Sequence, residues 1–211
     1  MSRPATRSPQ PDVRSREPAL RLILERRLTH AQAERRGRVL DSARALASAG
    51  GYAAVAMQDV AARAGVARAT VYRYFASKDH LVAEVTLGWA DELESALRAD
   101  PPRARRPAAR VREVFRRVVA AVQADPKLLA ACITSMMSPD PSANAARDRL
   151  SGVMAGFLRA TLRHGDAGDP DALGMVLGHV LFSVLASFTA QRCSAEEMLA
   201  ELETTAGIVL R

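Results

Sequence analysis

Apolar residues recur every three or four positions along most of this 211-residue chain, and Gly or Pro separates one such run from the next. After Ser77, for example, Val82, Val85, Trp89 and Leu93 form one apolar stripe if the segment is helical. No run alternates at period two, as a half-buried strand does, and aromatic residues make up only 4% of the chain. The pattern predicts an all-α protein of about nine helices.

Residues that start and stop helices set the expected boundaries. Gly50 and Gly51 end the first helix and Gly65 ends the second, whereas Asp-Pro pairs open the helices that start at 126 and 170. Ser194, with Glu197 three residues later, forms a capping box for the last helix. We expect helices at 34–49, 57–64, 67–75, 77–99, 107–124, 126–137, 142–164, 170–191 and 194–210.

The positive charge is concentrated near the N-terminus. The chain has a net charge of +7, and residues 1–80 carry 15 Lys or Arg against 7 Asp or Glu, whereas the remainder is close to neutral. A polyanion such as DNA is therefore expected to bind the first part of the chain. We divide the chain into a basic, largely disordered arm (1–33), a DNA-binding domain (34–80) and a second domain (81–211).

The remaining composition favours a cytoplasmic, nucleoid-associated protein. Cys132 and Cys193 lack zinc-site or CxxC spacing, which is typical of reduced thiols, and the first residues lack the apolar core of a signal peptide. Residues 172–191 are uncharged for long enough to span a bilayer, but Gly174, Gly178 and His179 interrupt them. We favour the buried centre of a helical bundle or dimer over a membrane span.

Residues 58–81, QDVAARAGVARATVYRYFASKDHL, are the most informative segment. They describe a short helix, a tight glycine turn and a second short helix. Such a unit buries a small apolar core and leaves the outer side of the second helix free to enter the major groove. The residues expected on that side or at the adjacent phosphates are Arg68, Ala69, Thr70, Tyr72, Arg73, Tyr74 and Lys78. The alternative is a generic three-helix bundle with solvated Arg and Tyr side chains.

The segment GGYAAVAMQDVAARAGVARATVYRYFASKDHL resembles the DNA-binding domain of TetR-family transcriptional regulators. The shared pattern is Gly-Tyr, then a hydrophobic-Ala pair, AGV, TxYxxF, SK and Leu. Val55, Ala56 and Ala67 depart from it, because family members often have Ser or Thr there as helix caps and phosphate contacts. Phosphate contacts are therefore expected to shift to Gln58, the basic arm, Arg36 or Arg38.

The resemblance implies that the second domain binds a small effector and forms a homodimer. Residues 128–162 are rich in polarisable apolar side chains, which suit an adaptable cavity but also fill ordinary cores. This stretch is weakly similar to actinobacterial repressors of steroid and lipid catabolism, which implies an apolar effector such as a steroid or acyl-CoA. The expected pocket residues are Trp89, Cys132, Met136, Met137, Phe157, Met175 and His179, and the expected dimer residues are Leu181, Leu185, Phe188, Leu202 and Val209.

Two other function classes remain open at this point. An all-helical enzyme would use His179, which is otherwise a buried structural histidine or a group that orients a ligand. The chain has no GxSxG, P-loop or GxGxxG motif and no metal-ligand spacing around its histidines, so we expect no catalytic residues, cofactor or metal. An effector-blind DNA-binding protein would leave the electrically balanced second domain unexplained.

Overall fold

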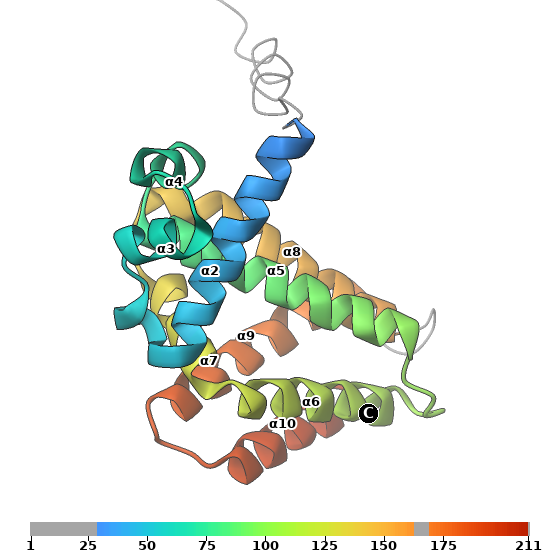
Figure 1. Ribbon diagram of the computed structural model, residues 1–211. Helices are drawn as coiled ribbons and strands as arrows, with labels where there is room; N and C mark the ends of the chain where they lie inside the picture. The colour runs from blue at the N-terminus through green and yellow to red at the C-terminus, as the bar shows by residue number, and fades with distance from the viewer. Residues whose placement is uncertain (1–28, 163–168, 211) are drawn as a thin grey trace, which may run out of the picture. The chain divides into compact units, whose positions relative to one another are not determined.

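The computed structural model describes residues 29–162 and 169–210, without the side chains of residues 155, 157–160 and 170. Across these ranges it contains nine α-helices and no strand, which confirms the all-helical prediction (Figure 1). Most of the arm expected at 1–33 lies outside the described residues. The helices are α2 (His30–Ala54), α3 (Met57–Ala64), α4 (Arg68–Tyr74), α5 (Lys78–Ala99), α6 (Pro107–Ala124), α7 (Pro126–Met137), α8 (Asn144–Thr161), α9 (Pro170–Thr189) and α10 (Ala195–Val209), with a 3-10 turn η2 (Pro141–Ala143).

The caps expected from the sequence start the helices. The hydroxyl of Ser77 accepts a hydrogen bond from the backbone N–H of His80, and the carboxylate of Asp125 accepts one from Leu128. At α10, the side chains and backbone N–H groups of Ser194 and Glu197 bond reciprocally as a capping box. These bonds satisfy N–H groups that the first turn of a helix leaves free, and so fix where each helix begins.

Glycine sets the two sharpest turns of the N-terminal half. Helix α2 is broken at Gly50 and Gly51, and Gly51 has φ 69° and ψ −163°. Gly65 ends α3 in the left-handed conformation, with φ 64° and ψ 40°. Both backbone conformations are readily available only to glycine, so the two turns depend on these residues.

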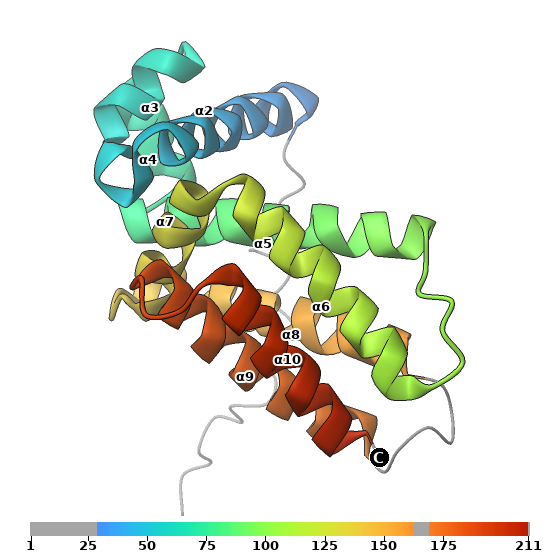
Figure 2. The same ribbon diagram turned by 90° about the horizontal axis from the view of Figure 1, so that it is seen from below.

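Residues 35–211 form one compact unit that contains two large hydrophobic cores. The front core joins α2, α3, α4 and the start of α5, and includes Val39, Val60, Val71, Phe75 and Leu81. The rear core joins α6, α9 and α10, and includes Val111, Phe115, Leu177, Met198 and Leu202. Helix α10 lies beside both α6 and α9 (Figure 2).

Helix α7 contributes to both cores. Leu128 and Ala131 belong to the front core, whereas Leu129 and Ile133 belong to the rear core. Because successive residues of a helix point in directions about 100° apart, one short helix can serve two cores only if it lies between them. The position of α7 therefore links packing at the front to packing at the rear.

Helix α9 is long and apolar enough to cross a membrane, and it alone has this property among the helices of the described ranges when bent pairs are left aside. Only 22% of its most apolar window is buried. Leu177, Leu181 and Val184 face the rear core, whereas Met175 and Val176 are exposed. The monomer therefore leaves an apolar strip of α9 uncovered.

Two residues that the sequence assigned to a dimer interface lie in the core of the monomer instead. Leu181 is 2% exposed and Leu202 is completely buried. Both leucines lie on the sides of their helices that pack against the rear core. An amphipathic pattern predicts that one side of a helix is buried, but not whether the same subunit or a second one covers that side. Leu185, Phe188 and Val209 are half-buried, and the first two pack against the rear core.

Candidate DNA-reading head and effector cavity

Helices α3 and α4 form a helix-turn-helix held by the front core. Val60, Ala61 and Ala64 of α3 are buried with Val71 of α4 and with Phe75, which follows α4. The turn between the helices is closed by hydrogen bonds from the N–H groups of Gly65 and Val66 to carbonyls of α3. We call α3, α4 and the parts of α2 and α5 in the front core the reading head.

Four residues of α4 form one solvent-exposed face: Arg68, Ala69, Tyr72 and Arg73. The Arg68 guanidinium donates a 3.3 Å hydrogen bond to the Tyr72 hydroxyl and lies 5.4 Å from the centre of its ring. This contact supports the Arg68 side chain, whose other N–H groups have no hydrogen-bond partner among the described residues. A helix face with two arginines beside a small alanine suits the major groove, where Arg pairs with guanine O6 and N7.

The other two residues expected to reach DNA from α4 are less available. Thr70 is half-buried, and the hydroxyl of Tyr74 is buried without a hydrogen-bond partner among the described residues. The ring of Tyr74 packs against the front core and under the guanidinium of Arg73. The expectation that the Tyr74 hydroxyl bonds to DNA is therefore wrong for this conformation, because Tyr74 lies on the inner side of α4.

Phosphate-contact candidates flank α4. Gln58 is exposed on the first turn of α3, and Lys78 is half-buried at the first position of α5. The Lys78 ammonium lies 3.8 Å from the centre of the Tyr52 ring, and burial lowers its pKa. Ala56 and Ala67 stand at the N-caps of α3 and α4 and form no side-chain cap, as their departure from the family pattern predicts.

Polar contacts fasten the reading head to both ends of α7. Ser48 of α2 donates a 2.5 Å hydrogen bond to the carboxylate of Asp125, which caps α7. At the other end, Tyr52 and Ser138 donate hydrogen bonds of 2.6 and 2.7 Å to the two carboxylate oxygens of Asp79. These contacts therefore connect α7 to α2 and to the start of α5.

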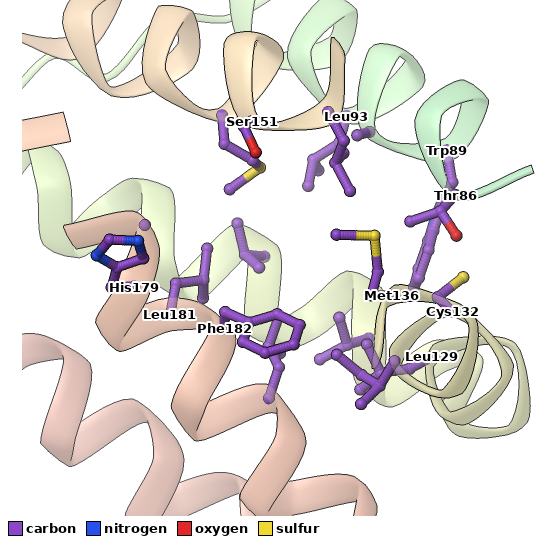
Figure 3. Close-up of a pocket in the computed structure, with 18 of the residues that line it drawn as sticks. Thr86, Trp89, Leu93, Leu129, Cys132, Met136, Ser151, His179, Leu181 and Phe182 are labelled. Carbon is purple, nitrogen blue, oxygen red and sulfur yellow. The ribbon is translucent and has the colours of Figure 1, made fainter. Parts of the chain in front are cut away.

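A cavity of about 440 Å³ lies on the rear side of α7, walled by α5, α6, α7, α8 and α9 (Figure 3). Its lining is almost wholly apolar, and the polar side chains in it are Thr86, Cys132, Ser151 and His179. In Figure 3, His179 lies at one end, and Thr86, Trp89 and Cys132 lie at the other. Size and lining match those of small-molecule sites in proteins.

The structure places five of the seven expected pocket residues around this cavity: Trp89, Cys132, Met136, Met175 and His179. Met137 is 70% exposed and points away from it, because it follows Met136 on the helix and faces another direction. The side chain of Phe157 lies outside the described part. His179 is exposed, so its interpretation as a buried structural histidine is wrong.

Several lining residues escaped the sequence analysis. Thr86 and Ser151 lie on helices whose pattern shows only that they are amphipathic. Leu181 and Leu185, assigned to a dimer interface from sequence, line the cavity as well. No sequence signal separates a core-facing leucine from a cavity-facing one, because both lie on the same apolar stripe.

Among the described residues, the titratable groups of the cavity form no metal-binding cluster. Burial raises the pKa of the Cys132 thiol to about 11, and a hydrogen bond with Thr86 opposes that shift. A thiol with so high a pKa is a poor nucleophile at neutral pH. Within residues 29–162 and 169–210, no three His, Cys, Asp or Glu side chains come together as a metal-binding group.

Known proteins resemble this chain in both halves. Residues 39–85 match the family of bacterial regulatory proteins named tetR, and residues 105–209 match the tetracyclin repressor-like C-terminal domain. The HTH-type transcriptional repressor KstR of Rhodococcus jostii (strain RHA1) is 37% identical over 183 residues, which cover 86% of this chain and 85% of that protein. The chain belongs to the TetR family.

Solved structures agree with the assignment. A TetR transcriptional regulator from Rhodococcus sp. RHA1 is 26% identical, with a TM-score of 0.77 over 86% of this chain and 98% of that one. Thermus thermophilus FadR, in complex with lauroyl-CoA, shares the fold at 22% identity, with a TM-score of 0.67 over 83% of this chain and 93% of its own. This TetR-family protein is thus a DNA-binding transcriptional repressor that acts through its helix-turn-helix, and not an enzyme.

The environment of Cys132 in this TetR-family protein predicts slow, pH-dependent alkylation. At pH 8 a thiol of pKa about 11 is only about one-thousandth thiolate, so iodoacetamide should leave Cys132 unmodified while it labels the half-buried Cys193. Labelling of Cys132 should rise about tenfold per pH unit up to its pKa. Peptide mass spectrometry measures both sites, with Cys193→Ser as the control. Equal labelling of both thiols at pH 8 would contradict the buried position of Cys132.

Proposed function

We propose that this repressor binds a palindromic operator as a homodimer and leaves it when a small apolar effector fills the cavity behind α7. The observation that carries the proposal is the double role of α7. One side of it packs in the front core of the reading head, and the other side, through Leu129, Ile133 and Met136, lines the cavity. The protein would work in the cytoplasm, on the DNA of the nucleoid.

The exposed face of α4 is the proposed recognition surface. Arg68 and Arg73 would read bases, and Ala69 would let the helix backbone come close to the groove. Gln58 and Lys78 would contact phosphates on either side, at the starts of α3 and α5, where the helix dipole also favours an anion. Arg36 and Arg38 are bound within the protein, to Glu84 and to the carbonyl of Ala64, which makes them weaker candidates for phosphate contacts.

The proposed effector is a largely apolar molecule of the size of a long acyl chain or a steroid. The cavity holds about 440 Å³ and offers methionine, leucine and aromatic surfaces that adapt to the shape of a ligand. His179 and Ser151 would orient one polar group of the effector. Support comes from the similarity to KstR and from the acyl-CoA complex of the FadR with the same fold.

The uncovered strip of α9 is the proposed dimer interface. Met175, Val176 and Phe182 are exposed on α9, and Ile208 is exposed on α10. Two such helix pairs related by a two-fold axis would bury these side chains in a four-helix arrangement. The interface would thus use the exposed side chains of α9, of which Met175 and Phe182 also line the open cavity, and not the inward-facing Leu181 and Leu202 that the sequence suggested.

Two sets of variants test DNA recognition. Arg68→Ala and Arg73→Ala should each relax base preference by about 1–3 kcal/mol, because a bidentate contact to guanine is lost. Lys78→Ala should weaken binding to all duplexes alike and flatten the salt dependence by about one unit of slope. Titration of an operator duplex selected from a random library measures each effect, with Arg98→Ala as an exposed control far along α5. A change of sequence preference in Lys78→Ala alone would overturn the assignment.

A pair of α9 variants tests the interface. Val176→Asp should give folded monomers, because Val176 is exposed on the proposed contact strip. Leu181→Asp should unfold the chain instead, because it buries a carboxylate in the rear core. Light scattering and thermal melting separate the two outcomes at micromolar concentration. A wild-type protein that is monomeric under these conditions would contradict the dimer.

Adjacent methionines on α7 test the cavity. Met136→Trp should fill the cavity and abolish effector response while operator binding persists, whereas Met137→Trp should leave the response intact, because Met137 lies outside the cavity. Release of a labelled operator duplex by lauroyl-CoA, stearoyl-CoA and progesterone provides the readout. The proposal fails if the probes release operator equally well from Met137→Trp and from Met136→Trp.

A further inference from the structure

A buried carboxylate lies where the reading head meets the cavity wall. Glu84, on α5, is only 8% exposed. Its oxygen Oε2 accepts a hydrogen bond from Arg36 of α2, and its oxygen Oε1 accepts one from Arg149 of α8. One carboxylate thus holds two guanidinium groups, one from the reading head and one from the cavity wall.

The charge balance makes this contact cooperative. Burial, with help from Arg36 and Arg149, lowers the pKa of His80, whose Nε2 lies 3.9 Å from Oε1, and so favours the neutral imidazole. Glu84 is therefore a buried anion that accepts hydrogen bonds from two guanidinium groups. A buried charge that loses a partner is left poorly compensated, so loss of either arginine weakens the hold on the other.

On the rear side the cluster adjoins the cavity. Arg149 immediately precedes Leu150 and Ser151, and both of these line the cavity. Arg149 itself is largely solvent-exposed, and Glu84 is what holds its tip against α5. A ligand that displaces α8 at Leu150 would therefore draw Arg149 away from the carboxylate.

On the front side the cluster reaches the end of the recognition helix. The guanidinium of Arg36 lies 5.3 Å from the centre of the Phe75 ring, and Phe75 is the completely buried residue that ends α4. His80 meets the same ring edge-on at 5.6 Å and accepts a 3.2 Å hydrogen bond from the N–H of Ala76. A continuous chain of contacts thus joins α8, through Glu84, Arg36 and Phe75, to the C-terminal end of α4.

We infer that Glu84, with Arg36 and Arg149, is the latch that couples the cavity to the reading head, and that effector binding opens it at Arg149. The inference rests on the proposed function, since it needs an operator and an occupied cavity. Closed, the latch fixes α2 and the end of α4 in the arrangement that binds operator. These three are positioning residues that act through Phe75, and they need not touch the effector.

The sharpest test is Arg149→Gln. Arg149 lies on α8, outside the reading head, and its exposure means that its removal leaves both hydrophobic cores intact. We expect operator affinity without any ligand to fall about 5- to 150-fold, the usual range of allosteric coupling. The remaining release by stearoyl-CoA should shrink in the same variant, because the step that the ligand would cause has already occurred. Arg149→Lys should restore part of the operator affinity and part of the ligand response.

A neighbouring ion pair supplies the matched control. Arg44 of α2 and Glu92 of α5 pair at 2.5 Å, so they also join these two helices, but within the described part of the chain neither forms an ion pair or hydrogen bond with α8. Glu92→Gln should leave operator affinity and ligand release unchanged. In a double-mutant cycle, Arg149→Gln and Arg36→Gln should be non-additive, because both open the same latch.

The outcomes separate the latch from the proposed function. If the full-length wild-type protein selects an operator that stearoyl-CoA releases, but Arg149→Gln binds and responds like wild type, the latch is wrong and the proposed function stands. An equal loss of affinity in Glu92→Gln would also overturn the latch. If wild type selects no operator, or no probe of the panel releases it, the proposed function fails first. Thermal melts of each variant exclude unfolding as the cause.

Discussion

The burial of α7 on two sides is the constraint on which the rest of the structure depends. A twelve-residue helix is too short to be stable by itself, so its apolar side chains must find partners on neighbouring helices. Leu128 and Ala131 find them in the reading head, and Leu129 and Ile133 find them in the rear core. The hydrogen bonds from Ser48 and Ser138, at the two ends of α7, then fix its direction. The helix cannot shift without a change in both cores.

The position of α7 also places one wall of the cavity beside the reading head. An apolar space of this size within a helical layer leaves side-chain atoms without partners, so a ligand that fills it gains contacts that the empty protein lacks. Because Met136 and Cys132 line the space from α7, and Leu150 lines it from α8, a ligand in the cavity would contact both of these helices. The proposed linkage requires that the ligand bind the operator-competent and operator-free conformations with different affinity.

Much of the architecture could be predicted from sequence because local chemistry decides it. Pro126, Gly65 and Ser194 mark helix ends through backbone geometry and capping bonds, and the observed helices begin or end at or beside them. The helix-turn-helix was similarly readable, because its glycine turn and small buried residues lie within one short segment. The inward position of Tyr74 is a detail of helix rotation that the segment did not reveal.

The sequence does not show which neighbouring helix, or which second subunit, packs against each apolar stripe. Leu181 and Phe182 are neighbours of similar hydrophobicity, yet one packs in the rear core and the other is partly exposed. Glu84 gave no signal at all, because its two arginine partners lie 48 and 65 residues away along the chain. Such choices depend on how the helices are assembled, which a pattern within one helix does not contain.

Reciprocity of binding tests the central claim most directly. Trp89, the single tryptophan of the chain, lines the cavity, so its fluorescence can report a probe such as lauroyl-CoA with and without saturating operator duplex. The account predicts that operator weakens probe binding by the same factor by which the probe weakens operator binding, about 5- to 150-fold. If the probe bound beside Trp89 with one affinity in both cases, cavity and reading head would be uncoupled, and the account would be wrong.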